Sequence, residues 1–327
     1  MKFSVIGGGS WGTAIACSIA SNQHDVALWT LDEKSAKQMS ELRENVEFLP
    51  GTILPDNVEV YSDLKKALEN TDIIILVVPS HAVRSVAKQI SEFVKNKPVV
   101  NLAKGLEQGT LLRMSQVIKE ELPECDVAVL SGPSHAEEVA LGMPTTNIIA
   151  GTNDELIKTI QKALMTPAFR LYTSKDVIGV ELGGSLKNVI ALCAGVCDGI
   201  GFGDNTKAAL MTRGIAEISR LGVAMGADWK TFGGLSGIGD LIVTCTSMHS
   251  RNRRAGILIG QGKTVKEALD EVKMVVEGVK TADAAYNLAL KYNVDMPICS
   301  EAYKVLFEGK SAKDAVYDLM LREEKAE

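Results

Sequence analysis

The sequence has few histidines and lacks the cysteine spacings of metal sites and disulfide frameworks. Its 327 residues include four histidines and six cysteines. The cysteines are scattered through expected helices and strands, with no CxxC pair and no histidine at zinc-ligand spacing. None of the histidines belongs to a nucleophile motif, and each is best explained as a surface or loop residue. We therefore expect no metal site and a reducing, cytoplasmic environment.

A positive net charge and a long apolar run are also missing. The formal net charge is −6, whereas nucleic acids and anionic membranes are bound by positively charged surfaces. From the sequence pattern alone, we identify no apolar run that approaches the roughly 20 residues that span a bilayer. The N-terminus MKFSVIGGGSWG passes directly from a strand pattern to a glycine turn, so we expect no signal peptide. We expect neither a nucleic-acid partner nor a membrane span.

The first part of the chain alternates β-rich runs with helical patterns, which is typical of βαβ units around a parallel sheet. The length exceeds the roughly 100–200 residues of one domain, so we expect two domains. The near-continuous Val, Ile and Leu content indicates strands buried on both faces. The expected strands are 2–7, 25–30, 72–79, 98–105 and 127–133, and 145–151 and 169–174 are expected to extend the sheet. The expected helices are 13–20, 82–94 and 111–122, with a further helix between the last two strands.

Strand patterns almost vanish from about Val177, and the remaining sequence is helical, including one continuous helical pattern over 265–292. Seventeen of the 29 glycines lie between Gly179 and Gly262, which suits helices that pack closely or end against a ligand. The predicted fold class is α/β: an N-terminal Rossmann-type doubly wound parallel sheet, residues 1–178, followed by an all-α substrate-binding and catalytic domain, residues 179–327.

A dinucleotide-binding pattern follows the first expected strand. Gly7, Gly9 and Gly12 satisfy GxGxxG, with Ser10 and Trp11 between them, and the pattern opens a helix as the motif requires. The first glycine permits a tight turn, the second lets a pyrophosphate approach the backbone, and the third lets helix pack on strand. The helix N-terminus then offers free N–H groups to the phosphates. We predict an NAD or NADP site.

Two charged residues after the second strand leave the cofactor preference open. Asp32 follows Gly12 by 20 residues, where a carboxylate can hydrogen-bond the ribose 2′-hydroxyl of NAD. Lys34 could instead pair with the 2′-phosphate of NADP. Both can equally be solvated loop charges.

Seven blocks in order along the chain resemble the bacterial NAD(P)-dependent sn-glycerol-3-phosphate dehydrogenases. The resemblance extends over nearly the whole chain. The blocks are GGGSWGTA (7–14), VVPSH (77–81), NLAKGLE (101–107), LSGPSHAEEVA (130–140), GGSLKNVIAL (183–192), GIGDLIVTCTSMHSRNRRAG (237–256) and VVEGVKTA (275–282).

The resemblance implies reversible hydride transfer between the nicotinamide and C2 of dihydroxyacetone phosphate, giving sn-glycerol 3-phosphate for phospholipid synthesis. It also implies a homodimer. Lys187 corresponds to the catalytic lysine, with Lys104, Asp240 and Thr244 as further catalytic residues. The implied substrate contacts are Lys104, Gly132, Ser134, Lys187, Asp240, Ser250, Arg251 and Asn252. The implied cofactor contacts beyond the glycine turn and residues 32 and 34 are Lys104, Ala136, Arg251, Val275 and Glu277.

Each assignment also has a plainer interpretation. A helix lysine such as Lys187 is usually a surface residue, although burial beside other cations would lower the pKa of such an amine and suit it to proton transfer. Lys104 can be a solvated residue at a strand end, and Ser134 can simply cap a helix.

The SRNRR run can be a basic surface segment, which we expect for Arg253 and Arg254. The Val275–Glu277 pair can be a plain helix end.

Two rival functions have weaker support from the sequence. The β-hydroxyacid dehydrogenases typically place asparagine four residues after their catalytic lysine, whereas Asn188 is adjacent to Lys187 and Ala191 occupies that position. A binding protein without turnover would not need Lys104, Lys187, Asp240 and Arg251 together.

Overall fold

The computed structural model of the protein describes residues 1–324. The chain forms two compact units, which we call the sheet unit and the helical unit. The sheet unit contains Met1–Lys104 and Leu112–Val180, and the helical unit contains Gly105–Leu111 and the chain from Glu181 onward. The boundary after residue 178 remains a proposal, and it lies in the first turn of helix α8 (Val177–Ile200).

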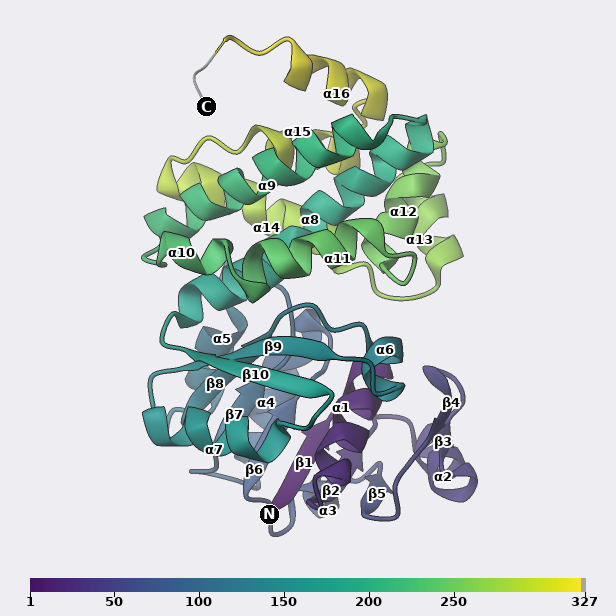
Figure 1. Ribbon diagram of the computed structural model, residues 1–327, viewed down its shortest axis with the longest axis vertical. Coiled ribbons are helices and arrows are strands. Elements are labelled where there is room, and N and C mark those ends of the chain that lie inside the picture. The colour runs from purple at the N-terminus through teal and green to yellow at the C-terminus, as the bar shows by residue number, and fades with distance from the viewer. Residues whose placement is uncertain (325–327) are drawn as a thin grey trace. The chain divides into compact units, whose positions relative to one another are not determined.

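An eight-stranded sheet organises the sheet unit (Figure 1). Its order is β10-β9-β8-β7-β6-β1-β2-β5. All neighbouring pairs from β8 to β5 are parallel, and the chain reverses its direction of winding beside β1, as in doubly wound dinucleotide-binding sheets. The strands are β1 (Lys2–Ile6), β2 (Asp25–Trp29), β5 (Val58–Tyr61), β6 (Ile73–Leu76), β7 (Val99–Asn101), β8 (Val127–Ser131), β9 (Thr145–Gly151) and β10 (Phe169–Ser174).

The last two strands extend the sheet as predicted, but they run opposite to the other strands of the sheet. Strand β9 is antiparallel to β8, and β10 is parallel to β9. The link from β8 to β9 carries only the five-residue helix α6 (Ala136–Ala140). Parallel neighbours usually require a longer crossover helix, whereas antiparallel neighbours do not.

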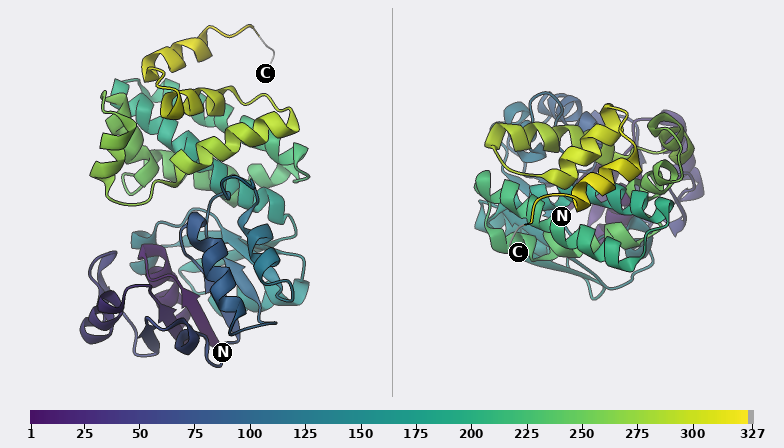
Figure 2. Two further views of the ribbon diagram at one scale, coloured as in Figure 1. Left: turned by 180° about the vertical axis from the view of Figure 1, so that it is seen from behind. Right: turned by 90° about the horizontal axis from the view of Figure 1, so that it is seen from above.

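Helices cover both faces of the sheet through two apolar clusters. One cluster buries side chains of α1, α6 and α7, and the other buries side chains of α3, α4 and α5. Figure 1 shows α1 and α7 in front of the sheet, whereas the view from behind in Figure 2 brings the blue helix α4 to the front. The helices are α1 (Ser10–Ser21), α3 (Leu64–Leu68), α4 (Val83–Ser91) after the 3-10 turn η1 (Ser80–Ala82), α5 (Met114–Glu121) and α7 (Asp154–Leu164).

A stretch between β2 and β6 contains short elements that the sequence analysis did not predict. Besides β5 and α3, it contains helix α2 and a separate two-stranded antiparallel sheet. The additional elements are α2 (Glu33–Leu42), β3 (Glu44–Asn45) and β4 (Leu49–Ile53).

The helical unit confirms the all-α character predicted for the C-terminal part. The continuous helix expected over 265–292 is wrong, because Lys273 adopts a left-handed conformation that ends α13. Helix α14 begins only at Glu277. After α8 come α9 (Asp204–Ala224), α10 (Trp229–Phe232), the π-helical turn η2 (Leu235–Gly239), α11 (Asp240–Thr246), α12 (Arg251–Gly260), α13 (Val265–Val272), α14 (Glu277–Tyr292), α15 (Pro297–Phe307) and α16 (Ala312–Met320).

Helix α8 is long and apolar enough to cross a membrane by length and composition, which the sequence analysis overlooked. However, 83% of its most apolar 18-residue window is buried inside the protein. Glycines let neighbouring segments approach it: a Cβ on Gly195 would lie 2.0 Å from the Arg253 carbonyl oxygen. A Cβ on Gly183 would lie 2.4 Å from the Ser236 carbonyl oxygen. Helix α8 is therefore placed as a core helix.

Candidate active site

The glycine turn between β1 and α1 fits a dinucleotide pyrophosphate. Gly7 has a positive φ of 132°, and its N–H donates to the Trp29 carbonyl oxygen. A Cβ on Gly12 would lie 1.8 Å from the Gly7 carbonyl oxygen, so only glycine permits this helix to begin here. A Cβ on Gly9 would meet nothing within 4 Å. The open space at Gly9 and the N-terminus of α1 suit an approaching phosphate.

The residues around the turn are fixed by contacts that the sequence did not indicate. The Ser10 hydroxyl donates to the Phe48 carbonyl oxygen at 2.7 Å, and Trp11 packs against the apolar cluster under α1. Asn45 is buried, and its amide donates to the Gly8 carbonyl oxygen at 2.9 Å and to Thr13 Oγ1 at 2.8 Å. No sequence pattern marked Asn45, because its short strand lies outside the βαβ pattern.

Asp32 caps helix α2. Its carboxylate accepts from the Ser35 N–H at 2.7 Å. This hydrogen bond holds the pKa of the exposed Asp32 carboxyl below its usual value. Lys34 lies in the first turn of α2 and is exposed. Asp32 is therefore an ionised acceptor at a helix start, and contact with a ribose remains a prediction.

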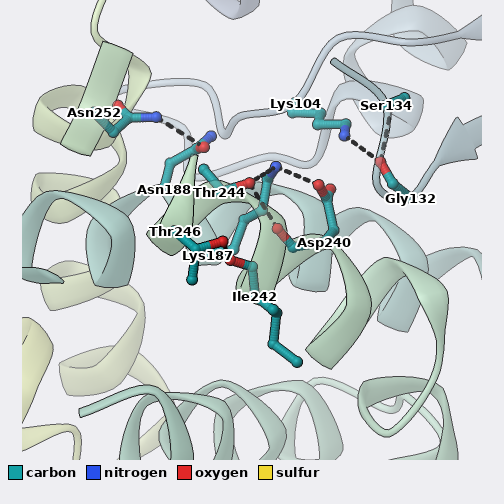
Figure 3. A network of polar contacts seen from close by, with 10 residues as sticks. All are labelled: Lys104, Gly132, Ser134, Lys187, Asn188, Asp240, Ile242, Thr244, Thr246 and Asn252. Atoms are coloured by element: carbon teal, nitrogen blue, oxygen red, sulfur yellow. Dashed lines mark hydrogen bonds and ion pairs between the residues drawn. The ribbon is translucent and has the colours of Figure 1, made fainter. Parts of the chain in front are cut away.

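Lys104 and Ser134 meet at one carbonyl of the sheet unit (Figure 3). Lys104 Nζ donates to the Gly132 carbonyl oxygen at 3.0 Å, and the Ser134 hydroxyl donates to the same atom at 2.9 Å. Gly132 has a positive φ of 137°, which suits glycine. The capping alternative for Ser134 is wrong, because His135 occupies the N-cap of α6 without a side-chain cap bond. Ala136 begins α6 and is buried.

Lys187 is a buried lysine in the helical unit. It is 6% exposed, and its ammonium donates to Asp240 Oδ1 at 2.5 Å and to Thr244 Oγ1 at 2.7 Å (Figure 3). The Thr244 hydroxyl lies one turn along α11 and donates to the Asp240 carbonyl oxygen at 2.6 Å. The surface interpretation of Lys187 is therefore wrong. The burial agrees with the condition considered for a catalytic lysine, whereas the group paired with the ammonium is the Asp240 carboxylate and not another cation.

The block before and within α12 supplies polar groups to the same unit. Ser250 caps α12, with its hydroxyl accepting from the Arg253 N–H at 3.2 Å, and Arg251 begins the helix. The Asn252 amide donates to Asn188 Oδ1 at 2.9 Å and accepts from the Gly278 N–H at 2.8 Å. Asn188, which the sequence analysis used only for its spacing, thereby joins this hydrogen-bonded chain.

Arg253 corrects the expectation of a basic surface run. Its side chain is 13% exposed and pairs with Asp198, whereas Arg254 is exposed. Val275 and Glu277 lie at the start of α14, where Val276 is the N-cap. Their helix-end position is observed, and their cofactor contacts remain predictions.

Comparisons with known proteins match both units to the same family. Residues 2–157 match the family described as NAD-dependent glycerol-3-phosphate dehydrogenase N-terminus, and residues 176–317 match its C-terminus. The chain is 55% identical to glycerol-3-phosphate dehydrogenase [NAD(P)+] of Fusobacterium nucleatum over 100% of this chain and 98% of that protein. It is 56% identical to glycerol-3-phosphate dehydrogenase [NAD(P)+] of Thermoanaerobacter sp. over 100% of this chain and 99% of that protein.

A crystal structure agrees as well. Glycerol-3-phosphate dehydrogenase from Coxiella burnetii aligns with a TM-score of 0.95 at 36% identity, covering 98% of this chain and 99% of that one. The resemblance inferred from the seven sequence blocks is therefore confirmed. The chain belongs to the NAD-dependent glycerol-3-phosphate dehydrogenase family.

Proposed function

We propose that this protein catalyses reversible hydride transfer between NAD(P)H and C2 of dihydroxyacetone phosphate, with Lys187 as proton donor and acceptor. The observation that carries the proposal is the buried Lys187 ammonium held by Asp240 and Thr244. The names of the matched relatives support the substrate and the use of a nicotinamide cofactor.

Ketone reduction requires a hydride, a proton and stabilisation of the developing alkoxide. The nicotinamide, when bound, supplies the hydride. Lys187 Nζ gives a proton to the alkoxide oxygen during reduction and takes it back from the hydroxyl during oxidation. Asp240 and Thr244 accept hydrogen bonds from this ammonium, so they fix the position and orientation of the Lys187 ammonium.

The substrate phosphate requires a local cation, because the protein has a net charge of −6. We assign this role to Arg251, whose planar guanidinium can form two parallel hydrogen bonds to phosphate. Ser250 and Asn252 are proposed as its neighbours in substrate binding. Lys104, Gly132 and Ser134 are proposed substrate contacts from the sheet unit.

The cofactor is proposed to bind at Gly7, Gly9, Ser10, Trp11 and Gly12, with Asp32 or Lys34 at the adenosine ribose. Further proposed cofactor contacts are Lys104, Ala136, Arg251, Val275 and Glu277. Six free cysteines support a reducing cytoplasm. The family resemblance supports a homodimer and a role in glycerophospholipid synthesis.

The test is a steady-state assay with purified protein and dihydroxyacetone phosphate. Loss of the near-ultraviolet absorbance of NADH or NADPH is recorded, with unphosphorylated dihydroxyacetone as the comparison substrate. Substrate-dependent oxidation that is efficient only with the phosphorylated ketone supports the proposal. Absence of turnover with both cofactors, in protein whose fold is verified by circular dichroism, would overturn it.

A further inference from the structure

Three charged residues that the proposed chemistry does not use form a partly buried ion network. Lys207 Nζ lies 2.6 Å from Asp198 Oδ1, and Arg253 Nε lies 2.7 Å from Asp198 Oδ2. The side chains are 13–17% exposed. The three residues belong to α8, α9 and α12, so one carboxylate joins three helices.

Arg253 also binds the segment that precedes its own helix. One terminal nitrogen donates to the Thr246 carbonyl oxygen at 2.7 Å and contacts Met248 Sδ at 3.1 Å. The Arg253 N–H donates to the Ser250 hydroxyl at 3.2 Å. Arg253 therefore contacts Thr246, the last residue of α11, and Ser250, the N-cap of α12, at the two ends of the segment that joins these helices.

The helices that this ion network connects also carry residues of the proposed active site. Helix α11 carries Asp240 and Thr244, and α12 begins with Arg251. Asp198 lies on α8, the helix that carries Lys187. Gly195 and Gly256 bring α8 and α12 into backbone contact, since a Cβ on Gly256 would lie 2.0 Å from the Leu192 carbonyl oxygen.

The charge state of Asp198 supports a role for this network in positioning Arg253. Hydrogen bonds from Lys207 and Arg253 outweigh the effect of burial and hold the pKa of the Asp198 carboxyl below its usual value. A charge-assisted pair in a partly buried place is more rigid than an exposed one, because its geometry is enforced by surrounding packing. The Arg253 side chain is thus fixed at one end by Asp198 and at the other by the Thr246 carbonyl.

We propose that Arg253 is a positioning residue for the substrate phosphate. Through Asp198 it fixes residues 246–251 against α8, so that Arg251 lies at a set position along the helix that carries Lys187. The inference rests on the proposed function. It predicts that Arg253 acts on phosphate recognition through Arg251, without touching the substrate.

The test compares Arg253→Lys with wild type, using dihydroxyacetone phosphate, unphosphorylated dihydroxyacetone and NADH. Lysine keeps the charge but cannot reach Asp198 and Thr246 together, since it lacks the planar fork. We expect the KM for dihydroxyacetone phosphate to rise about tenfold or more. Turnover of unphosphorylated dihydroxyacetone and the KM for NADH should change less than about twofold.

Two further variants keep the outcome clear. Asp198→Asn removes the negative charge that pairs with Arg253. It should also raise the KM for dihydroxyacetone phosphate selectively. Lys310→Met removes a lysine that pairs with Glu301 and Asp318 in α15 and α16, and it should leave the KM values unchanged. Thermal unfolding of every variant reports any general loss of stability.

Different results have different meanings. Equal losses with both ketones, or a lower melting temperature without a change in KM for dihydroxyacetone phosphate, would show that the network is only structural. Wild-type protein inactive on dihydroxyacetone phosphate would instead overturn the proposed function, and this inference with it. A selective loss in Arg253→Lys and Asp198→Asn, absent from Lys310→Met, would support the inference.

Discussion

Lys187 Nζ lies 2.5 Å from Asp240 Oδ1, and both side chains are almost completely buried. Breaking such a pair leaves one uncompensated charge inside the protein, which typically costs about 3–5 kcal/mol. The pair therefore contributes to the stability of the helical unit as well as to the proposed chemistry. Any test of Lys187 must separate these two effects.

Lys187→Met is expected to lower kcat by about 10²–10⁴, the usual scale for loss of a general acid. The stranded Asp240 should also lower the melting temperature. The double variant Lys187→Met/Asp240→Leu removes the stranded charge, so it should regain stability without regaining activity. Cofactor binding, measured by fluorescence titration, should persist in both. Retention of more than about half of wild-type turnover would exclude Lys187 from proton transfer.

Gly9→Ala is expected to weaken cofactor binding with little effect on stability. The added methyl group meets no protein atom within 4 Å, and Gly9 has an ordinary extended backbone with φ of −79°. It would occupy the space that the pyrophosphate needs. Gly12→Val is the contrasting variant, because its side chain collides with the Gly7 carbonyl and should lower both stability and affinity. Unaltered cofactor affinity in Gly9→Ala, by fluorescence titration, would place the pyrophosphate elsewhere.

Asp32→Ala is expected to reduce discrimination against NADPH if Asp32 holds the ribose diol, and to leave it unchanged if Lys34 governs recognition. The change also removes a helix cap worth about 1 kcal/mol. Asn153→Ala is the matched control, because Asn153 caps α7 through the Glu155 and Leu156 N–H groups. The ratio of kcat/KM for NADH and NADPH should change in Asp32→Ala if Asp32 holds the ribose diol, and it should stay unchanged in Asn153→Ala.

The sequence predicted the elements whose pattern is local. Buried strands such as β6 (IIIL) and β8 (VAVLS) appear as short runs of Ile, Leu and Val, and the glycine turn has a fixed spacing. The strand β4 has the sequence LPGTI with an exposed Pro50 and Gly51, so it shows neither alternation nor a continuous apolar run. The helix break at Lys273 could not be predicted, because a lysine rarely adopts the left-handed conformation found there.

The sequence was enough to identify many residues of the candidate site, but not the contacts that those residues make. Family motifs identified Lys187 and Asp240, whose side chains meet although they are 53 residues apart. Arg253 was expected at the surface because its partner, Asp198, is 55 residues away and no local pattern links them. Likewise, the support that Asn45 gives to Gly8 depends on tertiary packing and has no signature in the sequence.

Arg251→Ala is expected to raise the KM for dihydroxyacetone phosphate by roughly 10- to 150-fold. This corresponds to about 1.5–3 kcal/mol for a hydrogen bond to a charged group. Arg251→Lys should recover only part, since a single ammonium cannot bind in two parallel hydrogen bonds. Arg254→Ala, at an exposed position of the same helix, is the control. If Arg251→Ala weakened the reduction of unphosphorylated dihydroxyacetone equally, the phosphate role would belong to another residue.

Glu217 is expected to make the helical unit less stable as the pH rises from about 4.5 to 7. Glu217 is 2% exposed, and its carboxyl accepts from the Ile298 N–H at 2.8 Å and the Cys299 N–H at 3.3 Å, at the start of α15. Burial raises its pKa from 4.5 to about 7, and the two N–H groups oppose this only in part. The folded protein therefore holds a proton that the unfolded chain releases between these two values.

The sign of the effect follows from this proton. Its contribution to stability is fully present below about pH 4.5, falls as the pH rises, and is lost above about pH 7, by an amount on the order of 3 kcal/mol. Glu217→Gln keeps a carbonyl oxygen for the Ile298 N–H but cannot ionise. The difference in unfolding free energy between wild type and Glu217→Gln, from urea titrations across this range, should therefore shift in favour of the variant as the pH rises. A difference that stays constant with pH would show that Glu217 titrates in the folded protein as it does in the unfolded chain.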